Sequence, residues 1–118
     1  MSDLLKLNPD FKPAFDGKAL AKELIAKILV EQKLTQAFLF GSAAENKNTE
    51  NSDLDILLVI PNDADEKNYY KVTQRPFFSS RAVDWIVKKE SDFNIQKNIG
   101  GISLIAYQTG ILIYDDKK

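Results

Sequence analysis

The chain has 118 residues, 44% of them hydrophobic, and a formal net charge of -1, so it can bury one compact core and little beyond it. It contains neither Cys nor His. This excludes thiolate and imidazole zinc sites, a cysteine nucleophile and a catalytic triad with an imidazole base. Metal chemistry would therefore depend on carboxylates, and eleven of the seventeen acidic residues are Asp.

Charge and hydropathy also limit the partners that we expect. Sixteen basic against seventeen acidic residues leave no overall field that would attract nucleic acid or anionic lipid. The N-terminus is too polar for a signal sequence, and the longest apolar run, 56–60, is far shorter than a membrane span. We expect a cytoplasmic protein without membrane or strong nucleic-acid partners, folded as a single domain over 1–118. Two prolines predict an irregular N-terminal segment over 1–16, and 115–118 form a polar tail.

The first half of the chain predicts one helix and two strands. Asp16 can cap a helix over 17–33, in which apolar side chains recur at helical spacing opposite lysines. An apolar run over 37–40 that ends at Gly41 predicts a buried strand that stops abruptly. The run over 54–60 gives the strongest strand pattern in the chain.

The second half continues the alternation of helices and strands. The pattern predicts a helix over 63–73 capped by Asp63 or Asp65, a strand over 82–87, a helical segment capped by Ser91 that breaks at Gly100-Gly101, a helix from Ser103 to Thr109, and a strand over 111–114. We therefore predict an α/β (α+β) fold, with a small mixed β-sheet of about four strands flanked by helices. The strand order remains open.

Asp53 and Asp55 are two residues apart where the strongest strand begins. In a strand, such side chains project from the same face, which places these carboxylates side by side. Their repulsion, roughly 4 kcal/mol at about 4 Å with an effective dielectric near 20, would be relieved by a shared Mg²⁺. The spacing alone is weak, because about one Asp-x-Asp is expected by chance at this Asp content. A second one, at Asp63 and Asp65, is better explained as helix capping.

Gly41 and Ser42 follow the first predicted strand, and ten residues lie between Ser42 and Asp53. A glycine lets backbone amides approach a phosphate closely, and the serine hydroxyl adds a donor. If residues 43–45 begin a short helix, its N-terminus would point its positive dipole at that phosphate. The alternative is that Gly41 only turns the chain and Ser42 caps the helix. The nearby Asp pair favours the phosphate site.

The run Leu39-Phe40-Gly41-Ser42, ten intervening residues and Asp53-Leu54-Asp55-Ile56 resemble the signature of the DNA polymerase β-like nucleotidyltransferase superfamily. The chain length and the apolar C-terminal segment ending at Tyr114 are similar to its smallest members, the minimal nucleotidyltransferases. The resemblance covers roughly residues 20–114 and implies the nucleotidyltransferase fold.

The resemblance implies a set of site residues and a reaction. The family carries a third carboxylate on a later strand, and Asp84 is the Asp of this chain with apolar strand residues on both sides. Asp53, Asp55 and Asp84 would hold two Mg²⁺ ions, and Asp84 would accept the proton. Gly41 and Ser42 would bind the phosphates of ATP or another nucleoside triphosphate. The nucleotidyl group, AMP in the favoured case, would pass to a hydroxyl as pyrophosphate leaves. The alternative for Asp84 is a strand Asp paired with Lys or Arg.

The resemblance also implies a partner, a helical HEPN-type protein that accepts the nucleotidyl group in a toxin–antitoxin pair. Many members carry Arg at the position of Ala43 and Gly at that of Asn46, so part of the phosphate grip is lost here. An alternative therefore stays open, an interaction protein with the nucleotidyltransferase fold and little or no catalysis that acts by binding its partner. A metal- or nucleotide-binding regulatory domain is a weaker option.

Basic and aromatic side chains near the strand of Asp84 have two interpretations. Arg75 and Arg81 flank that strand, and surface ion pairs are favoured over phosphate contacts. The aromatic residues Tyr69, Tyr70, Phe77, Phe78 and Trp85 could stack a base, but packing in the core is favoured.

Overall fold

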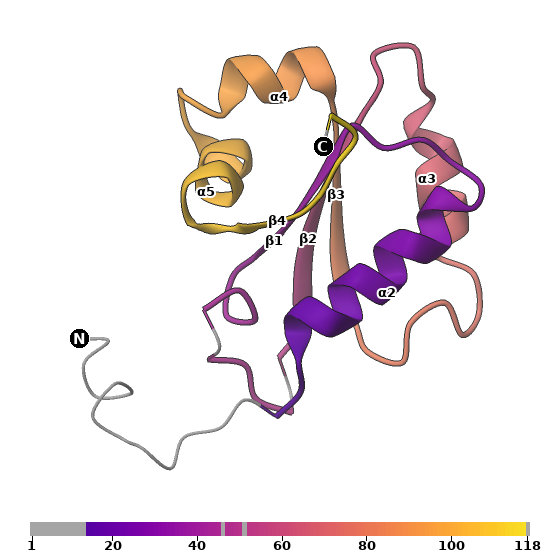
Figure 1. Ribbon diagram of the computed structural model, residues 1–118, viewed down its shortest axis with the longest axis vertical. Coiled ribbons are helices and arrows are strands. Elements are labelled where there is room, and N and C mark those ends of the chain that lie inside the picture. The colour runs from indigo at the N-terminus through magenta and orange to yellow at the C-terminus, as the bar shows by residue number, and fades with distance from the viewer. Residues whose placement is uncertain (1–13, 46, 51, 118) are drawn as a thin grey trace.

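The computed structural model describes residues 14–45, 47–50 and 52–117 of the chain, and these residues form four helices and a four-stranded sheet. The elements in chain order are α2 (Gly17–Leu29), β1 (Gln36–Phe40), β2 (Leu54–Ile60), α3 (Glu66–Thr73), β3 (Val83–Lys89), α4 (Glu90–Gln96), α5 (Gly101–Thr109) and β4 (Ile111–Asp115). Figure 1 shows α2 and α3 on one side of the sheet and α4 and α5 on the other. The irregular segment predicted over 1–16 lies mostly outside the described residues.

The sheet has the order β3-β2-β1-β4 and mixes both strand directions. β1 is antiparallel to β2 and to β4, whereas β2 and β3 are parallel. This confirms the predicted small mixed sheet and supplies the strand order that the sequence left open. The register aligns Phe40 of β1 with Asp55 of β2, and Asp55 with Asp84 of β3. One row across three strands therefore contains two of the three predicted site carboxylates.

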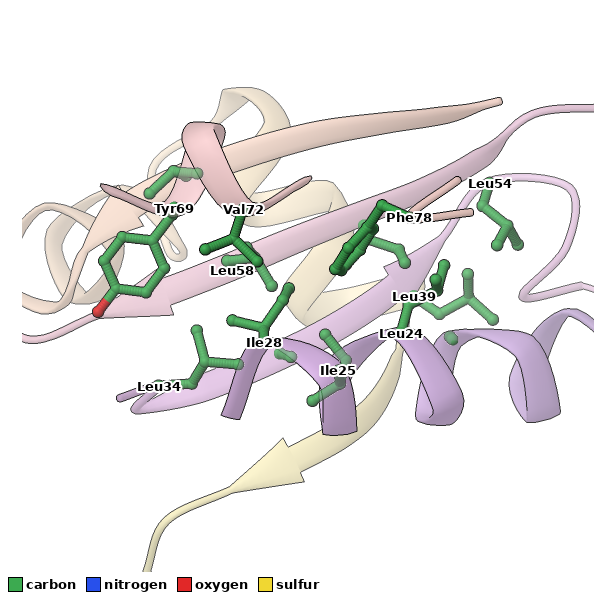
Figure 2. Close-up of a cluster of buried hydrophobic side chains, with 14 of the residues drawn as sticks. Leu24, Ile25, Ile28, Leu34, Leu39, Leu54, Leu58, Tyr69, Val72 and Phe78 are labelled. Carbon is green, nitrogen blue, oxygen red and sulfur yellow. The ribbon is translucent and has the colours of Figure 1, made fainter. Parts of the chain in front are cut away.

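Alternate residues of the sheet face two separate hydrophobic clusters. On the face of α2 and α3, Figure 2 shows Leu24 and Ile28 of α2 in one cluster with Leu39 and Leu58 of the sheet. The face of α4 and α5 holds a second cluster, formed by Phe38, Phe40, Leu57, Val59, Phe93 and Ala106. Because both faces are covered, residues 56–60 of β2 are a continuous apolar run instead of an alternating one.

Helix α2 begins as predicted but ends early. The Asp16 side chain accepts a hydrogen bond from the amide of Ala19 at 3.0 Å, which confirms the cap. The helix stops at Leu29, four residues before the predicted end at 33. The amides of Glu31 and Gln32 both bond to the carbonyl of Ile28, which tightens the last turn and releases the chain toward β1.

Two predicted helix starts in the C-terminal half are wrong. Ser91 does not cap α4, because the helix already begins at Glu90 with Lys89 at the N-cap position. The Ser91 amide donates a hydrogen bond to the side-chain oxygen of Asn62 at 2.8 Å. Ser103 is buried inside α5, which starts at Gly101 after the N-cap Gly100. Of the two predicted caps of α3, Asp65 is the one observed, so this helix begins at Glu66 instead of residue 63. The predicted break at Gly100-Gly101 is confirmed, because Gly100 precedes the first residue of α5.

Strand ends differ from the prediction by one or two residues. β3 continues to Lys89, beyond the predicted end at 87, and β4 includes Asp115, which was assigned to the polar tail. Among the described residues no helix has the length and apolar character needed to cross a membrane.

Candidate active site

Three Asp side chains gather at the end of the sheet where β2 and β3 begin. Asp55 is the second residue of β2 and pairs in register with Asp84, the second residue of β3. Side chains in register on parallel neighbours point to the same face. Asp53 directly precedes β2, so the prediction that it lies within the strand is wrong. Asp55 is half-buried, whereas Asp53 and Asp84 are exposed.

The electrostatics of Asp55 reflect its two neighbours. Burial raises the pKa of Asp55, and the negative charges of Asp84 and Asp53 raise it further. Within the described ranges none of the three carboxylates forms a hydrogen bond or an ion pair. Asp84 therefore has no basic partner among those residues. No other described residue therefore competes with a ligand for these three carboxylates.

Gly41 allows the Asp55 carboxylate to lie against the end of β1. Its φ is +77°, a conformation that L side chains rarely adopt. A Cβ atom at this position would collide with Oδ2 of Asp55. Gly41 therefore turns the chain and also leaves the space that the Asp55 carboxylate occupies.

Residues 42–45 form a turn, so the condition of a short helix beginning at 43–45 is not met. The carbonyl of Ser42 accepts hydrogen bonds from the amides of Lys47 at 2.9 Å and Glu45 at 3.2 Å. Over the described residues, the amides of Ser42, Ala43 and Ala44 have no hydrogen-bond acceptor. Consecutive unpaired amides after a residue at positive φ are the elements of an anion-binding nest. Phosphate binding here would depend on these amides and not on a helix dipole.

The side chain of Ala43 packs into the core and not toward this turn. Ala43 is buried, and a Cβ added to Gly17 would lie only 2.7 Å from the Ala43 Cβ. The first turn of α2 therefore sits directly on the Gly41-Ser42 turn. A longer side chain at position 43 would push α2 away. Asn46, the second departure from the family pattern, lies outside the described residues.

A network of contacts holds the loop that leads from this turn to Asp53. The Asn48 side chain donates to the carbonyl of Phe15 at 2.8 Å, just before α2. The Arg81 guanidinium stacks on the Phe15 ring, 3.7 Å from its centroid, and donates to the carbonyl of Glu50 at 2.9 Å. Arg81 thus joins the start of α2, the loop and the start of β3. The sequence interpretation missed this role, although the position of Arg81 just before the strand of Asp84 was a usable signal.

The two arginines near β3 differ in their contacts. Arg75 pairs with Glu31 through two hydrogen bonds, one of 2.7 Å, which confirms the favoured ion pair. For Arg81 the ion pair is wrong within the described part of the chain, where its guanidinium contacts the Phe15 ring and the Glu50 carbonyl and no carboxylate. The hydrogen bond from Arg75 lowers the pKa of Glu31.

A pocket of about 380 Å³ opens beside Asp84. Its lining includes Tyr70, Phe77, Trp85 and Arg81. Core packing, as favoured from the sequence, holds for Tyr69 and Phe78, while Tyr70 and Trp85 are partly buried at the edge of the cluster. Core packing is wrong for Phe77, which is 98% exposed and has a φ of +63°. A strained, exposed aromatic side chain at a pocket mouth is a candidate for ligand contact.

The carboxylates of Asp53, Asp55 and Asp84 are of the chemical type that binds a hard divalent cation. Three carboxylates from neighbouring strand ends are the oxygen ligands that Mg²⁺ prefers. A cation would also relieve the repulsion that raises the pKa of Asp55. In the described part of the chain, no three acidic side chains are already arranged as a metal centre. Metal binding would therefore require rotation of the exposed side chains of Asp53 and Asp84.

Comparison with known proteins decides the family. The model of the family described as polymerase beta, nucleotidyltransferase, matches residues 23–118. The chain belongs to this family. The family match includes the Gly41-Ser42 turn and all three aspartates. A search among curated proteins finds no match.

The fold of this nucleotidyltransferase domain is also found in a solved structure. A crystal structure from Sulfolobus solfataricus at 1.40 Å resolution, described provisionally as a nucleotidyltransferase, has a TM-score of 0.61 and 23% sequence identity. The alignment covers 93% of this chain and 94% of that chain. At this identity the likeness shows the shared fold alone.

Proposed function

We propose that this nucleotidyltransferase-family protein is a Mg²⁺-dependent enzyme that transfers AMP from ATP, or another nucleotidyl group from its triphosphate, to a hydroxyl. One observation carries the proposal: the Asp55 carboxylate lies against Gly41 and is coupled to the charges of Asp84 and Asp53, and none of the three carboxylates has a partner among the described residues. Carboxylates this close to one another repel, and a bound cation relieves that repulsion. A triphosphate needs the same cation for its own charge.

The proposed reaction assigns separate metal-binding and phosphate-binding roles to the residues of the site. Asp53 and Asp55 would hold the Mg²⁺ ion that carries the triphosphate, and Asp84 would join them at a second ion. Bound Mg²⁺ neutralises phosphate charge and makes an acceptor hydroxyl easier to deprotonate. The unpaired amides after Gly41, with the Ser42 hydroxyl, would bind the terminal phosphates.

Asp84 is the proposed proton acceptor, because its exposed carboxylate lies at the outermost of the three strands. As the hydroxyl oxygen bonds to the α-phosphorus, its proton passes to Asp84 directly or through water. The bond between the α-phosphorus and the bridging oxygen breaks, and pyrophosphate leaves with that oxygen. Neither step needs an imidazole, which this chain lacks.

The partner that we propose as acceptor is a protein. The resemblance noted from the sequence implies a helical HEPN-type protein in a toxin–antitoxin pair, with this chain as the neutralising member. The absence of a large basic excess in the sequence argues against a nucleic-acid acceptor.

The experiment is incubation with ATP labelled at the α-phosphate, Mg²⁺ and a candidate HEPN-type protein encoded beside this chain. We expect label on the partner, lost with Asp53→Ala or Asp55→Ala and after chelation of Mg²⁺. Asp63→Ala with Asp65→Ala is the matched control, because that pair has the same spacing but lies at the start of α3. Label transfer that survives the changes at Asp53 and Asp55 would exclude this site.

A second candidate function is partner binding without catalysis, and one observation favours it. Large apolar side chains are exposed along α4, α5 and their connection, namely Ile95, Ile99, Ile102, Ile105 and Tyr107. Exposed apolar patches of this kind mark interaction surfaces. In the same assay, partner binding without label transfer, unchanged by Asp55→Ala and weakened by Ile99→Lys, would favour this function.

A further inference from the structure

β3 is an edge strand, and no described residue pairs with its outer side. The amide of Leu54 donates to the carbonyl of Ala82 at 3.1 Å. Because backbone groups alternate along a strand, those of Asp84 also point to β2, whereas the amides and carbonyls of Val83 and Trp85 point outward. Such an outward row of unpaired groups can template another strand.

We propose that the acceptor hydroxyl is carried by an extended acidic polypeptide segment that pairs with the outer edge of β3. The segment adds a fifth strand to the sheet and places a Ser, Thr or Tyr residue opposite Asp84. This inference rests on the proposed nucleotidyl transfer and names how its acceptor is held. Strand addition to a free sheet edge is an established mode of peptide recognition.

The geometry of the reaction favours this edge. Phe40, Asp55 and Asp84 form one row across β1, β2 and β3, with neighbouring strands about 4.8 Å apart. A residue opposite Asp84 on an added strand takes the next place in that row, on the same face. The phosphate-binding turn of Gly41 and Ser42 lies at the other end of the row.

An in-line transfer needs the attacking and leaving oxygens on opposite sides of the α-phosphorus. The strand order supplies this arrangement. With the terminal phosphates at the Gly41-Ser42 turn beside β1, the α-phosphorus would lie near Asp55 of β2 and the hydroxyl beyond Asp84 of β3. An acceptor held elsewhere, for example over α5 beside β1, would approach from the side of the leaving group.

The pocket beside Asp84 fits the residues that flank the hydroxyl. In an added strand those residues point to the opposite face, where the side chains of Val83 and Trp85 line the pocket of about 380 Å³. Phe77, at 98% exposure, stands at this pocket and would be covered by a flanking apolar side chain. The pocket therefore selects an apolar or aromatic residue next to the hydroxyl residue.

The charges along β3 favour an acidic segment. Arg81 precedes the strand and Lys88 and Lys89 end it, and within the described residues none of the three has a carboxylate partner. Asp84 is the one acid of the strand. The two lysines also discourage pairing between copies of this edge, which confines pairing to the part near Asp84.

The first experiment uses the single tryptophan, Trp85 on β3, as a fluorescent reporter. The probes are ten-residue peptides that alternate Glu and Val around one central Ser or Tyr. Val83→Pro removes an outward amide without breaking a bond to β2, and Val83→Ala shortens the same side chain but keeps that amide. We expect Val83→Pro to weaken peptide binding at least tenfold and to abolish label transfer, with Val83→Ala within about twofold of the wild type.

Controls separate this inference from the proposed function. Stabilisation by Mg²⁺ and ATP should persist in Val83→Pro, because the phosphate turn is untouched. If the wild type is not stabilised by Mg²⁺ and ATP, the proposed function fails. If it is stabilised but binds peptide equally well with Val83→Pro, or transfers label to a ten-nucleotide RNA in place of peptide, the edge-strand acceptor is overturned.

A measurement on the wild type keeps the inference testable if Val83→Pro does not fold. Saturating peptide should slow hydrogen exchange at the outward amides of Val83, Trp85 and Val87, while that of the Asp84 amide changes little. If the peptide slows hydrogen exchange equally at all four amides, or at none of them, strand pairing is overturned.

Discussion

At the scale of single residues, the site depends on a contact between a glycine and a carboxylate. Gly41 adopts a φ of +77° and leaves the space that Oδ2 of Asp55 occupies. The Gly-Ser pair and the Asp-x-Asp pair, twelve residues apart, are therefore one structural unit. The sequence signature predicted both pairs but gave no sign that they touch, because the contact depends on the register between β1 and β2.

Gly41→Ala should destabilise the fold by about 2 kcal/mol and abolish stabilisation by Mg²⁺ and ATP. Alanine is strained at this φ, and its Cβ displaces the Asp55 carboxylate. Urea unfolding measures the first effect and thermal melting the second. Gly100→Ala is the control, because a Cβ there meets nothing within 4 Å. Its expected cost is below about 1 kcal/mol, and equal costs would contradict the account.

Asp55→Asn should stabilise the metal-free protein near neutral pH by roughly 0.5 kcal/mol, or about 3 °C in Tm. The substitution removes a half-buried charge that faces the carboxylates of Asp53 and Asp84. The variant should also lose the rise in Tm that Mg²⁺ gives the wild type. A variant that melts lower without metal, or that keeps the response to Mg²⁺, would show that these charges do not interact as described.

At the scale of elements, contacts between neighbouring elements position the site. The stack of Arg81 on Phe15 fastens the loop before Asp53 to the first turn of α2. The ion pair of Arg75 with Glu31 connects the chain after α3 to the end of α2. Neither contact follows from periodicity or motifs, because each joins residues more than thirty positions apart.

Arg81→Met should cost about 1 kcal/mol and raise the KM for ATP more than it lowers kcat. The methionine keeps the aliphatic stem but loses the guanidinium stack and the hydrogen bond to the Glu50 carbonyl. Arg81→Lys should recover part of the KM, since an ammonium group still attracts the ring. Equal loss of stability without any change in KM would assign Arg81 to the fold alone.

The ion pair of Glu31 gives a pH dependence. The hydrogen bond from Arg75 lowers the pKa of Glu31 below its usual value of 4.5. A carboxyl with a lowered folded pKa stabilises the fold above its unfolded pKa, and this contribution is lost as pH falls through the folded pKa. Glu31→Gln should therefore be slightly less stable than the wild type near pH 7 in urea unfolding. The difference should shrink as pH falls below 4.5 and vanish once Glu31 is protonated in both the folded and unfolded states. A constant difference would contradict the assignment.

At the scale of the whole molecule, the sequence predicted the class of fold and most elements, since helix and strand periodicity are local. The strand of residues 54–60 and the cap at Asp16 were predicted because burial and capping act within a few residues. Strand order, the turn in place of a helix at 43–45, and the exposed Phe77 depend on tertiary packing. The same applies to the alignment of Asp55 with Asp84, which only the parallel pairing of β2 and β3 creates.

The central claim is that Asp53, Asp55 and Asp84 bind the metal that carries a nucleoside triphosphate. Crystals of the protein grown with Mn²⁺ and α,β-methylene ATP, in which the bond to be broken is replaced, test it most directly. We expect anomalous density for Mn²⁺ between the three carboxylates, with the terminal phosphates at the amides that follow Gly41. Ordered nucleotide without metal at these carboxylates, or Mn²⁺ bound only at other residues, would contradict it.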